Sequence, residues 1–277
     1  MAKRQSNRLT EQQKEGQGPI TIYHNDAQIH DQEVGNTSQA TLCTLQLEYP
    51  MLQFRHRESL TKKEINLALQ KIDNYLGQTL FVENASIRPD GGLIEVMDDH
   101  NNWRVVLVTE AKHQGKDIEN IKAGKYVGKK TDQDIMAAGN AIERAYKNVN
   151  EIANYMLSER YFPYILFLEG SNFLTQDVIV ERPDGRKVKL EYSDGTLNRL
   201  DRLTAANYGM PINTNLCKNR FVQCNDTIIM LQAPSIYTQG GGGHWEDSDM
   251  INIMLDVAHT SLKMLACDLF DQFLKNS

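Results

Sequence analysis

The sequence contains few cysteines and prolines and has no long apolar segment. None of its four cysteines belongs to a Cys-x-x-Cys pair, which argues against a zinc knuckle, and unpaired thiols are typical of a reducing cytoplasm. The longest apolar run, near residues 161–168, includes a proline and is far shorter than the ~20 residues that a membrane span needs. The N-terminus lacks the apolar core of a secretory signal. These absences predict a cytoplasmic protein with no membrane partner.

An excess of positive charge is also absent, because 30 lysines and arginines stand against 36 acidic residues in 277, a net charge of −6. A nucleic-acid partner is not excluded, since phosphate attraction depends on where cations cluster. Residues 112–130 contain six lysines and two acidic residues, whereas residues 244–277 contain two lysines and six acidic residues. The lysine-rich segment 112–130 could bind an anion, or it could be a solvated loop.

Apolar periodicity and turn residues predict an α/β fold with a sheet covered by helices. Thr61 and Glu64 have the spacing of a capping box at the start of a helix. The residues around Pro183-Asp184-Gly185 predict a hairpin that projects from the body, and residues 240–243 are four glycines that predict a flexible loop. The predicted helices span 61–74, 135–156 and 250–274, and the predicted strands span 80–82, 93–96, 103–112, 164–168, 178–180 and 188–190.

The residues that suggest chemistry are Asp90, Glu110 and Lys112. Asp90 follows Pro89 at the edge of a strand, and nineteen residues separate it from Glu110 at the end of the strongest strand candidate. Alternation along that strand puts Glu110 and Lys112 on one face, with Cα atoms about 6.5 to 7 Å apart. Two carboxylates could hold Mg²⁺, and the lysine could hold or polarise the water that attacks a phosphodiester.

The alternative is that these three residues are two surface carboxylates and a lysine without a catalytic role. The sequence contains a control, because Pro183-Asp184 is followed by Glu191 without a lysine two places on. Only the first set is complete, and it has the strand context. His113 could be a general base, but a structural hydrogen bond is favoured because His113 points to the opposite strand face from Lys112.

Several segments carry a resemblance to a known family. They are Pro89-Asp90, EAKHQGKD at 110–117, MAAGNAIER at 136–144, FLEGSN at 167–172 and LNRLDRLTAANYGMPIN at 197–213. These segments resemble the EcoRI-type type II restriction endonucleases of the PD-(D/E)xK nuclease superfamily. The resemblance covers nearly the whole chain.

The resemblance implies a fold, an activity and partners. The fold would be a central mixed sheet flanked by helices, with a polar arm at 1–20 and one α/β nuclease domain at 21–277. Arms near 113–130 and 176–192 would embrace DNA. A homodimer would cut both strands of GAATTC between G and A with Mg²⁺ in the bacterial cytoplasm. An adenine methyltransferase would protect host DNA.

The resemblance also implies roles for single residues. Asp90, Glu110 and Lys112 would be catalytic, with Mg²⁺ held by Asp90 and Glu110. Asparagine can form two hydrogen bonds with adenine, and arginine can form two with guanine. The asparagine and the arginines among the implied DNA-binding residues agree with this chemistry. The implied DNA-binding residues are Met136, Gly139, Asn140, Ala141, Arg144, Arg199, Arg202, Lys116, Lys129 and Lys130.

Other interpretations of these residues and of the whole chain remain open. Without the resemblance, Arg144 is a solvated helix residue, and Arg199 and Arg202 form salt bridges. Thr196 stands where the family has an apolar residue that touches a pyrimidine, so the sequence leaves open whether this chain makes that contact. The alternative functions are a nuclease of the same fold with a different target and a DNA-binding protein without catalysis. The complete catalytic set argues against the second.

Overall fold

The computed structural model describes residues 25–78, 85–127, 139–192, 194, 200, 203, 211–218 and 220–266. The predicted arm at 1–20 and the predicted strand at 80–82 lie outside these residues. No helix in the described ranges has both the length and the apolar character to cross a membrane.

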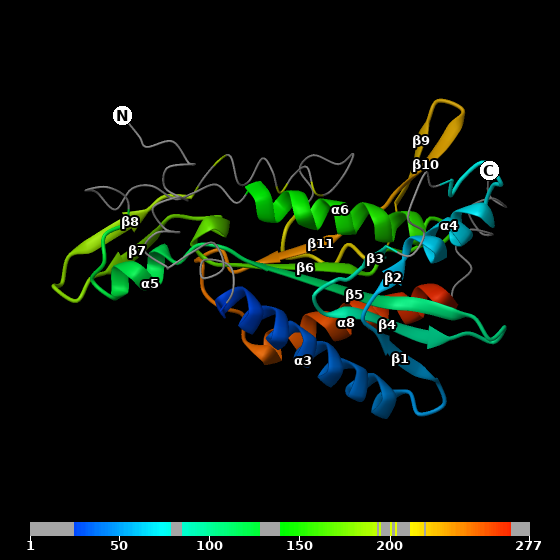
Figure 1. Ribbon diagram of the computed structural model, residues 1–277, viewed down its shortest axis with the longest axis horizontal. Helices are drawn as coiled ribbons and strands as arrows, with labels where there is room; N and C mark the ends of the chain where they lie inside the picture. The colour runs from blue at the N-terminus through cyan, green and yellow to red at the C-terminus, as the bar shows by residue number, and fades with distance from the viewer. Residues whose placement is uncertain are drawn as a thin grey trace.

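Five of the described strands form a central mixed sheet (Figure 1). The order is β1 (Phe54–Arg57), β4 (Gly92–Met97), β5 (Trp103–His113), β6 (Tyr164–Glu169) and β11 (Ser235–Thr238). β1, β4 and β5 pair antiparallel, whereas β5, β6 and β11 pair parallel. β6 is buried along its whole length and β5 is buried over residues 105–111, which explains their apolar runs. The predicted fold class and the strands at 93–96, 103–112 and 164–168 are confirmed.

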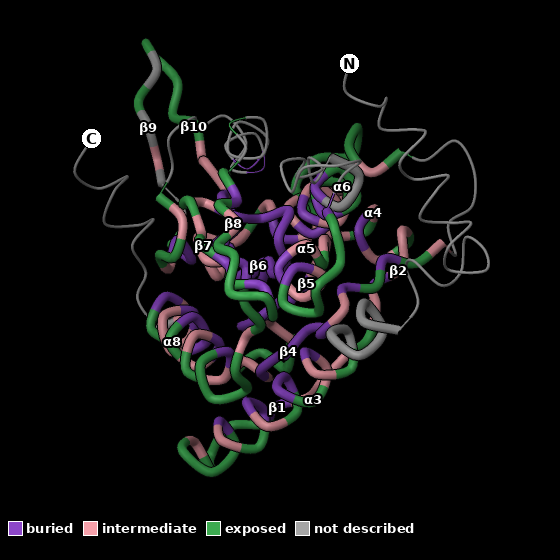
Figure 2. Tube along the Cα trace, turned by 90° about the vertical axis from the view of Figure 1, so that its left-hand side faces the viewer, coloured by how far each residue is buried: buried purple, intermediate pink, exposed green. Residues whose placement is uncertain are grey.

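Helices cover both faces of this sheet (Figure 1). α4 (Lys62–Gln70) and α6 (Gly139–Tyr155) lie on one side, and α3 (Asn25–Glu48) and α8 (Asp247–Ala266) lie side by side on the other. The main core lies between the sheet and these helices, and Figure 2 shows the buried segments gathered there. Its members include Val34 and Leu45 of α3, and Met254 and Val257 of α8.

Two antiparallel hairpins extend from the body. β7 (Val178–Glu181) and β8 (Lys187–Leu190) form the predicted hairpin, while β9 (Arg220–Cys224) and β10 (Thr227–Leu231) form one that the sequence analysis did not identify. β7 and β8 pack against α5 (Asp117–Lys122) at one end of the molecule (Figure 1). This contact has its own small core, which contains Ile118, Ile121, Val127, Leu174, Val180 and Leu190.

The helix boundaries partly agree with the sequence. α4 begins after Thr61, whose side chain and that of Glu64 form the predicted capping box, but the helix ends at Gln70 rather than at 74. α8 begins at Asp247, three residues before the predicted start. The predicted residues 135–138 of the long helix and 267–274 of the last helix lie outside the described part of the chain. The small elements β2 (Leu60–Thr61), β3 (Ser86–Ile87) and the 3₁₀ turn η1 (Ser171–Phe173) complete the description.

Candidate active site

A tight turn before β4 positions Asp90. The Gly92 amide donates to the Pro89 carbonyl at 3.0 Å, and the Gly91 amide donates to the Thr109 carbonyl of β5 at 2.9 Å. Gly92 has a φ of +71°, and a Cβ there would lie 2.5 Å from the backbone oxygen of Arg57. Glycine is therefore required at this position, and the turn holds Asp90 beside the neighbouring strand.

The three predicted catalytic residues meet in space. The Lys112 Nζ lies 2.5 Å from Asp90 Oδ2 and 2.6 Å from Glu110 Oε1. Asp90 Oδ2 also accepts a hydrogen bond from the Ala111 amide at 3.1 Å. Glu110 and Lys112 share one face of β5, as their two-residue spacing predicts. The structure thus brings together two carboxylates and one ammonium at the turn and the end of the central strand.

Two residues that the sequence analysis did not single out hold Glu110 in place. The Asn148 side-chain amide, on α6, lies 3.0 Å from each oxygen of the Glu110 carboxylate. The Tyr164 hydroxyl, at the start of β6, donates to Glu110 Oε2 at 3.2 Å. Asn148 follows Ala145 by three positions and therefore lies on the buried face of the helix. The signal in the sequence that could have identified Asn148 is a polar residue on an otherwise apolar helix face.

Burial and charge set the protonation of this cluster. Burial raises the pKa of Glu110, and the negative charge of Asp90 adds to the rise, while Lys112 opposes it. Burial alone would lower the pKa of Lys112, but attraction to Glu110 and Asp90 outweighs it and raises that pKa. Burial and the Glu110 charge raise the pKa of Tyr164 well above its usual range. Lys112 is therefore an ammonium and Tyr164 a neutral hydroxyl at neutral pH.

The donor set fits a hard divalent cation. Asp90 and Glu110 present carboxylate oxygens that already converge on one positive charge, the Lys112 ammonium. Mg²⁺ prefers such oxygens, and it is commonly bound by one or two carboxylates together with substrate phosphate. The Glu110 carboxylate is buried and oriented by two neighbours, which prepares it as a ligand.

The predicted DNA-binding residues are only partly described. Arg144 on α6 and Lys116, just before α5, are exposed. Gly139, Asn140 and Ala141 form the first described turn of α6. Five further residues lie outside the described ranges, namely Met136, Lys129, Lys130, Arg199 and Arg202. The assignment of these residues to DNA therefore stays a prediction.

Two other sequence predictions can be followed in the structure. His113 Nδ1 lies 2.9 Å from Glu169 Oε1, which confirms the structural hydrogen bond that was favoured for this residue. The glycines at 240–243 form a loop that packs closely at Gly240 and Gly242, whereas Gly243 is exposed. Gly242 has a φ of +72°, and a Cβ there would lie 2.8 Å from the Cδ1 atom of Ile118.

The chain is similar over nearly its full length to type II restriction enzymes. A family profile described as "Restriction endonuclease EcoRI" matches residues 16–272. The type II restriction enzyme EcoRI of Escherichia coli is 63% identical over 270 residues, covering 98% of this chain and 98% of that protein. The type II restriction enzyme RsrI of Cereibacter sphaeroides is 51% identical over 267 residues, covering 96% of each. The resemblance implied that RsrI is the more similar of the two, and these identities correct that expectation.

Proposed function

Because the chain belongs to the EcoRI family of restriction endonucleases, we propose that it cuts both strands of GAATTC between G and A with Mg²⁺. Membership makes it a type II restriction endonuclease, a site-specific deoxyribonuclease, as the sequence predicts. Enzymes of this family are metal-dependent nucleases that act on DNA. The target, the cut position and the identity of the metal belong to the proposal, and identity over nearly the full length of EcoRI supports them.

The observation that carries the catalytic assignment is the meeting of Asp90, Glu110 and Lys112 within hydrogen-bond distance. Asp90 and Glu110 hold Mg²⁺, which when bound lowers the pKa of a coordinated water and stabilises charge on the phosphate. Attraction to both carboxylates raises the pKa of Lys112, so in this structure it is a cation that can hold or polarise water beside the phosphate. Asn148 and Tyr164 orient Glu110.

DNA recognition in this proposal uses a symmetric homodimer on a palindromic site. Asn140, Ala141 and Arg144 read the adenine and thymine steps, and Arg199 and Arg202 face guanine. The other contacts come from Met136, Gly139, Lys116, Lys129 and Lys130. Sedimentation of the protein on a GAATTC duplex should give two chains per duplex, and one chain per duplex would contradict the dimer.

The proposal extends to where the enzyme acts and how host DNA is protected. The enzyme acts in the bacterial cytoplasm, and a cognate adenine methyltransferase protects host DNA. The segments 113–130 and 176–192 act as arms around DNA, which agrees with the packing of α5 against the β7–β8 hairpin at one end of the molecule. A DNA-binding protein without catalysis is not favoured, because the catalytic set is complete and assembled.

The catalytic assignment is tested with Glu110→Gln and Asp90→Asn, which remove a negative charge with little change in size. Both variants should lose Mg²⁺-dependent cleavage while still binding a GAATTC duplex. The chain contains a matched control in its second Pro-Asp pair, where Asp184 is exposed. Asp184→Asn should cut like the wild type. Undiminished cutting by either site variant would overturn the assignment.

The target is tested separately from the catalytic residues. A plasmid with one GAATTC site and the same plasmid with one base pair of that site changed are incubated with the protein and Mg²⁺, and the ends are mapped. Cleavage between G and A in the first plasmid alone supports the proposed target. Cleavage of both plasmids, or cleavage elsewhere, contradicts it while leaving the nuclease assignment intact.

A further inference from the structure

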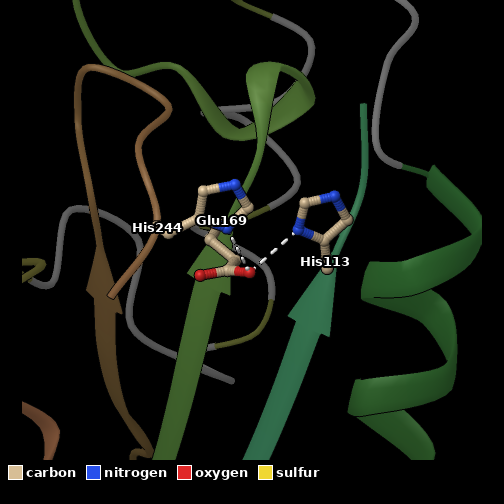
Figure 3. A group of neighbouring side chains, drawn as sticks. All are labelled: His113, Glu169 and His244. Atoms are coloured by element: carbon tan, nitrogen blue, oxygen red, sulfur yellow. Dashed lines mark hydrogen bonds and ion pairs between the residues drawn. The ribbon is translucent and has the colours of Figure 1, made fainter. Parts of the chain in front are cut away.

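A second cluster of potential metal ligands lies across β5 from the catalytic residues. His113 and Glu169 are the last residues of β5 and β6 and are direct partners in the parallel register. His244 comes from the segment between β11 and α8, and it faces the same carboxylate (Figure 3). His113 follows Lys112 directly, and alternation along the strand puts it on the other face of the sheet. The cluster is therefore separate from Asp90 and Glu110.

The two imidazole rings converge on one oxygen atom. Glu169 Oε1 lies 2.9 Å from His113 Nδ1 and 3.2 Å from His244 Nδ1. The ligand atoms of all three residues lie within 4.8 Å of one another. Ligands of a tetrahedral zinc ion, with bonds near 2.0–2.1 Å, are about 3.3 Å apart. The two distances from Glu169 Oε1 to the imidazole nitrogens are therefore close to the spacing of zinc ligands.

The surrounding structure fixes these side chains. The side chains of His113 and Glu169 are 7% and 2% exposed, whereas His244 is 61% exposed. The Trp245 amide donates to Glu169 Oε2 at 3.0 Å, which holds the second carboxylate oxygen away from the two imidazoles. The Trp245 indole also donates to the Leu168 carbonyl at 3.1 Å and anchors the segment that carries His244. His113 and Glu169 are thus buried and His244 faces solvent, which leaves a path by which a metal ion could enter the cluster.

Negative charge around the cluster favours a cation. Glu33 on α3 interacts electrostatically with Glu169, His113, His244 and Asp247, and burial together with Glu169 raises its pKa. Glu119 Oε1 lies 3.9 Å from the Nε2 atom of His244, the nitrogen that does not face Glu169. Several carboxylates therefore lie near the two imidazoles. A bound dication would offset this charge.

We propose that His113, Glu169 and His244 bind a divalent transition metal ion, with Zn²⁺ as the representative. Two imidazole nitrogens and a carboxylate oxygen suit Zn²⁺, Ni²⁺, Cu²⁺ or Fe²⁺, whereas Mg²⁺ and Ca²⁺ prefer oxygen ligands. Three protein ligands leave one position for water. The ion would replace the hydrogen-bonding protons between the imidazoles and Glu169. It would connect the ends of β5 and β6 to the segment before α8.

The proposal is tested by metal binding to the full chain without DNA. Protein freed of metal with a chelator is titrated with Zn²⁺ against a chromophoric indicator, and with Co²⁺, whose visible absorption reports a four-coordinate site. Excess Mg²⁺ is present throughout to occupy Asp90 and Glu110. The wild type should bind one Zn²⁺ per chain that Mg²⁺ does not displace. At free Zn²⁺ 100-fold above Kd, its Tm should rise by roughly 5 to 10 °C.

His244→Gln is the informative variant, because His244 is the exposed ligand and its replacement should leave the fold intact. It should weaken Zn²⁺ binding at least about tenfold and abolish most of the Tm rise. His259→Gln is the matched control, since His259 also pairs with a single carboxylate, Glu48 at 2.7 Å, without a second histidine. It should bind like the wild type. Equal affinity in wild type and His244→Gln, or full displacement by Mg²⁺, would overturn the proposal.

Discussion

Asn148 shows how a single neutral side chain can control a charged site. It lies 3.0 Å from both oxygens of Glu110, which is 1% exposed. A buried carboxylate that loses these hydrogen bonds holds its proton more tightly and binds a metal less well. Such supporting contacts typically contribute 10–100-fold to metal affinity or activity.

We therefore expect Asn148→Ala to lower Mg²⁺-dependent cleavage about 10–100-fold while leaving DNA binding in place. Tyr164→Phe removes one hydrogen bond, at 3.2 Å, and should have a smaller effect. Asn154→Ala, at an exposed position of the same helix, is the control. The measurement is the cleavage rate as a function of Mg²⁺ concentration. A wild-type rate in Asn148→Ala would show that this amide does not support the site.

Cys217 provides a second prediction for a single residue, because burial raises the pKa of its thiol to about 12. At pH 8 a thiol with that pKa is about 0.01% thiolate, whereas an ordinary thiol near 8.5 is about a quarter ionised. In the folded protein, iodoacetamide should modify the exposed Cys43 and leave Cys217 unmodified. Peptide mass spectrometry before and after unfolding in urea measures both. Equal labelling of the two thiols in the folded state would contradict the prediction.

The same pKa has a consequence for stability. The folded-state value is higher than the unfolded one, so the folded chain keeps its proton where the unfolded chain loses it. The stabilising contribution of Cys217 is full below about pH 8.5 and is lost as the pH rises toward 12.

The sequence predicts some of the site residues and misses others for a physical reason. Glu110 and Lys112 could be placed on one face because two-residue alternation is a local property of a strand. Asn148 and Tyr164 could not, because they are 38 and 54 residues away from Glu110 and reach it only after the helix and strand pack. The meeting of His244 with Glu169 likewise depends on the path of the chain after β11.

At the level of single elements, the start of α4 is determined by local chemistry. The Thr61 hydroxyl accepts from the Glu64 amide at 3.2 Å, and the Glu64 carboxylate accepts from the Thr61 amide at 2.8 Å. Glu64 also pairs with Arg57 at 2.5 Å, which connects the helix to β1. The cap therefore joins two neighbouring elements.

Thr61→Ala should destabilise the fold by about 1 kcal/mol, because it removes the side-chain acceptor of the Glu64 amide in the first turn of the helix. For a chain of this size the Tm should fall by roughly 2–4 °C. Thr61→Ser keeps the hydroxyl and should restore most of the loss, and Lys63→Ala, at an exposed position, should change little. Thermal unfolding followed by circular dichroism provides the measurement. An unchanged Tm in Thr61→Ala would show that the cap does not contribute.

The contrast between β5 and α3 explains why some elements could be predicted and others could not. β5 was predicted to within one residue, since a strand buried on both faces has a continuous apolar sequence. α3 was missed because its buried face includes polar Thr37, Ser38 and Thr41, and Gly35 lies within it. Thr41 donates to the Thr37 carbonyl at 2.8 Å, so its hydroxyl can be buried within the helix. The buried face of α3 therefore does not show the apolar periodicity that predicts a helix.

At the level of the whole molecule, the lysine-rich segment 112–130 predicts a salt dependence. Lys116 and Lys122 are exposed near α5, and Lys129 and Lys130 lie outside the described ranges. Replacing these four lysines with glutamine should reduce the slope of log K against log salt by roughly 0.9 for each lost phosphate contact. Four exposed lysines elsewhere are the control, namely Lys63, Lys71, Lys218 and Lys263. Equal slopes for the two quadruple variants would show that these lysines do not contact phosphate.

The pairing of α3 with α8 has a consequence for how the enzyme is made. The Thr41 hydroxyl of α3 lies 3.3 Å from the Met254 sulfur of α8, and these residues are 213 positions apart. At 5–20 residues per second, a ribosome takes about 10 to 40 s to cover that interval. Throughout this time the nascent chain carries one helix of the layer behind β5 without its partner, so the strand that bears Glu110 and Lys112 lacks full support. Synthesis order thus delays the appearance of a DNA-cutting activity until the late part of the chain has emerged.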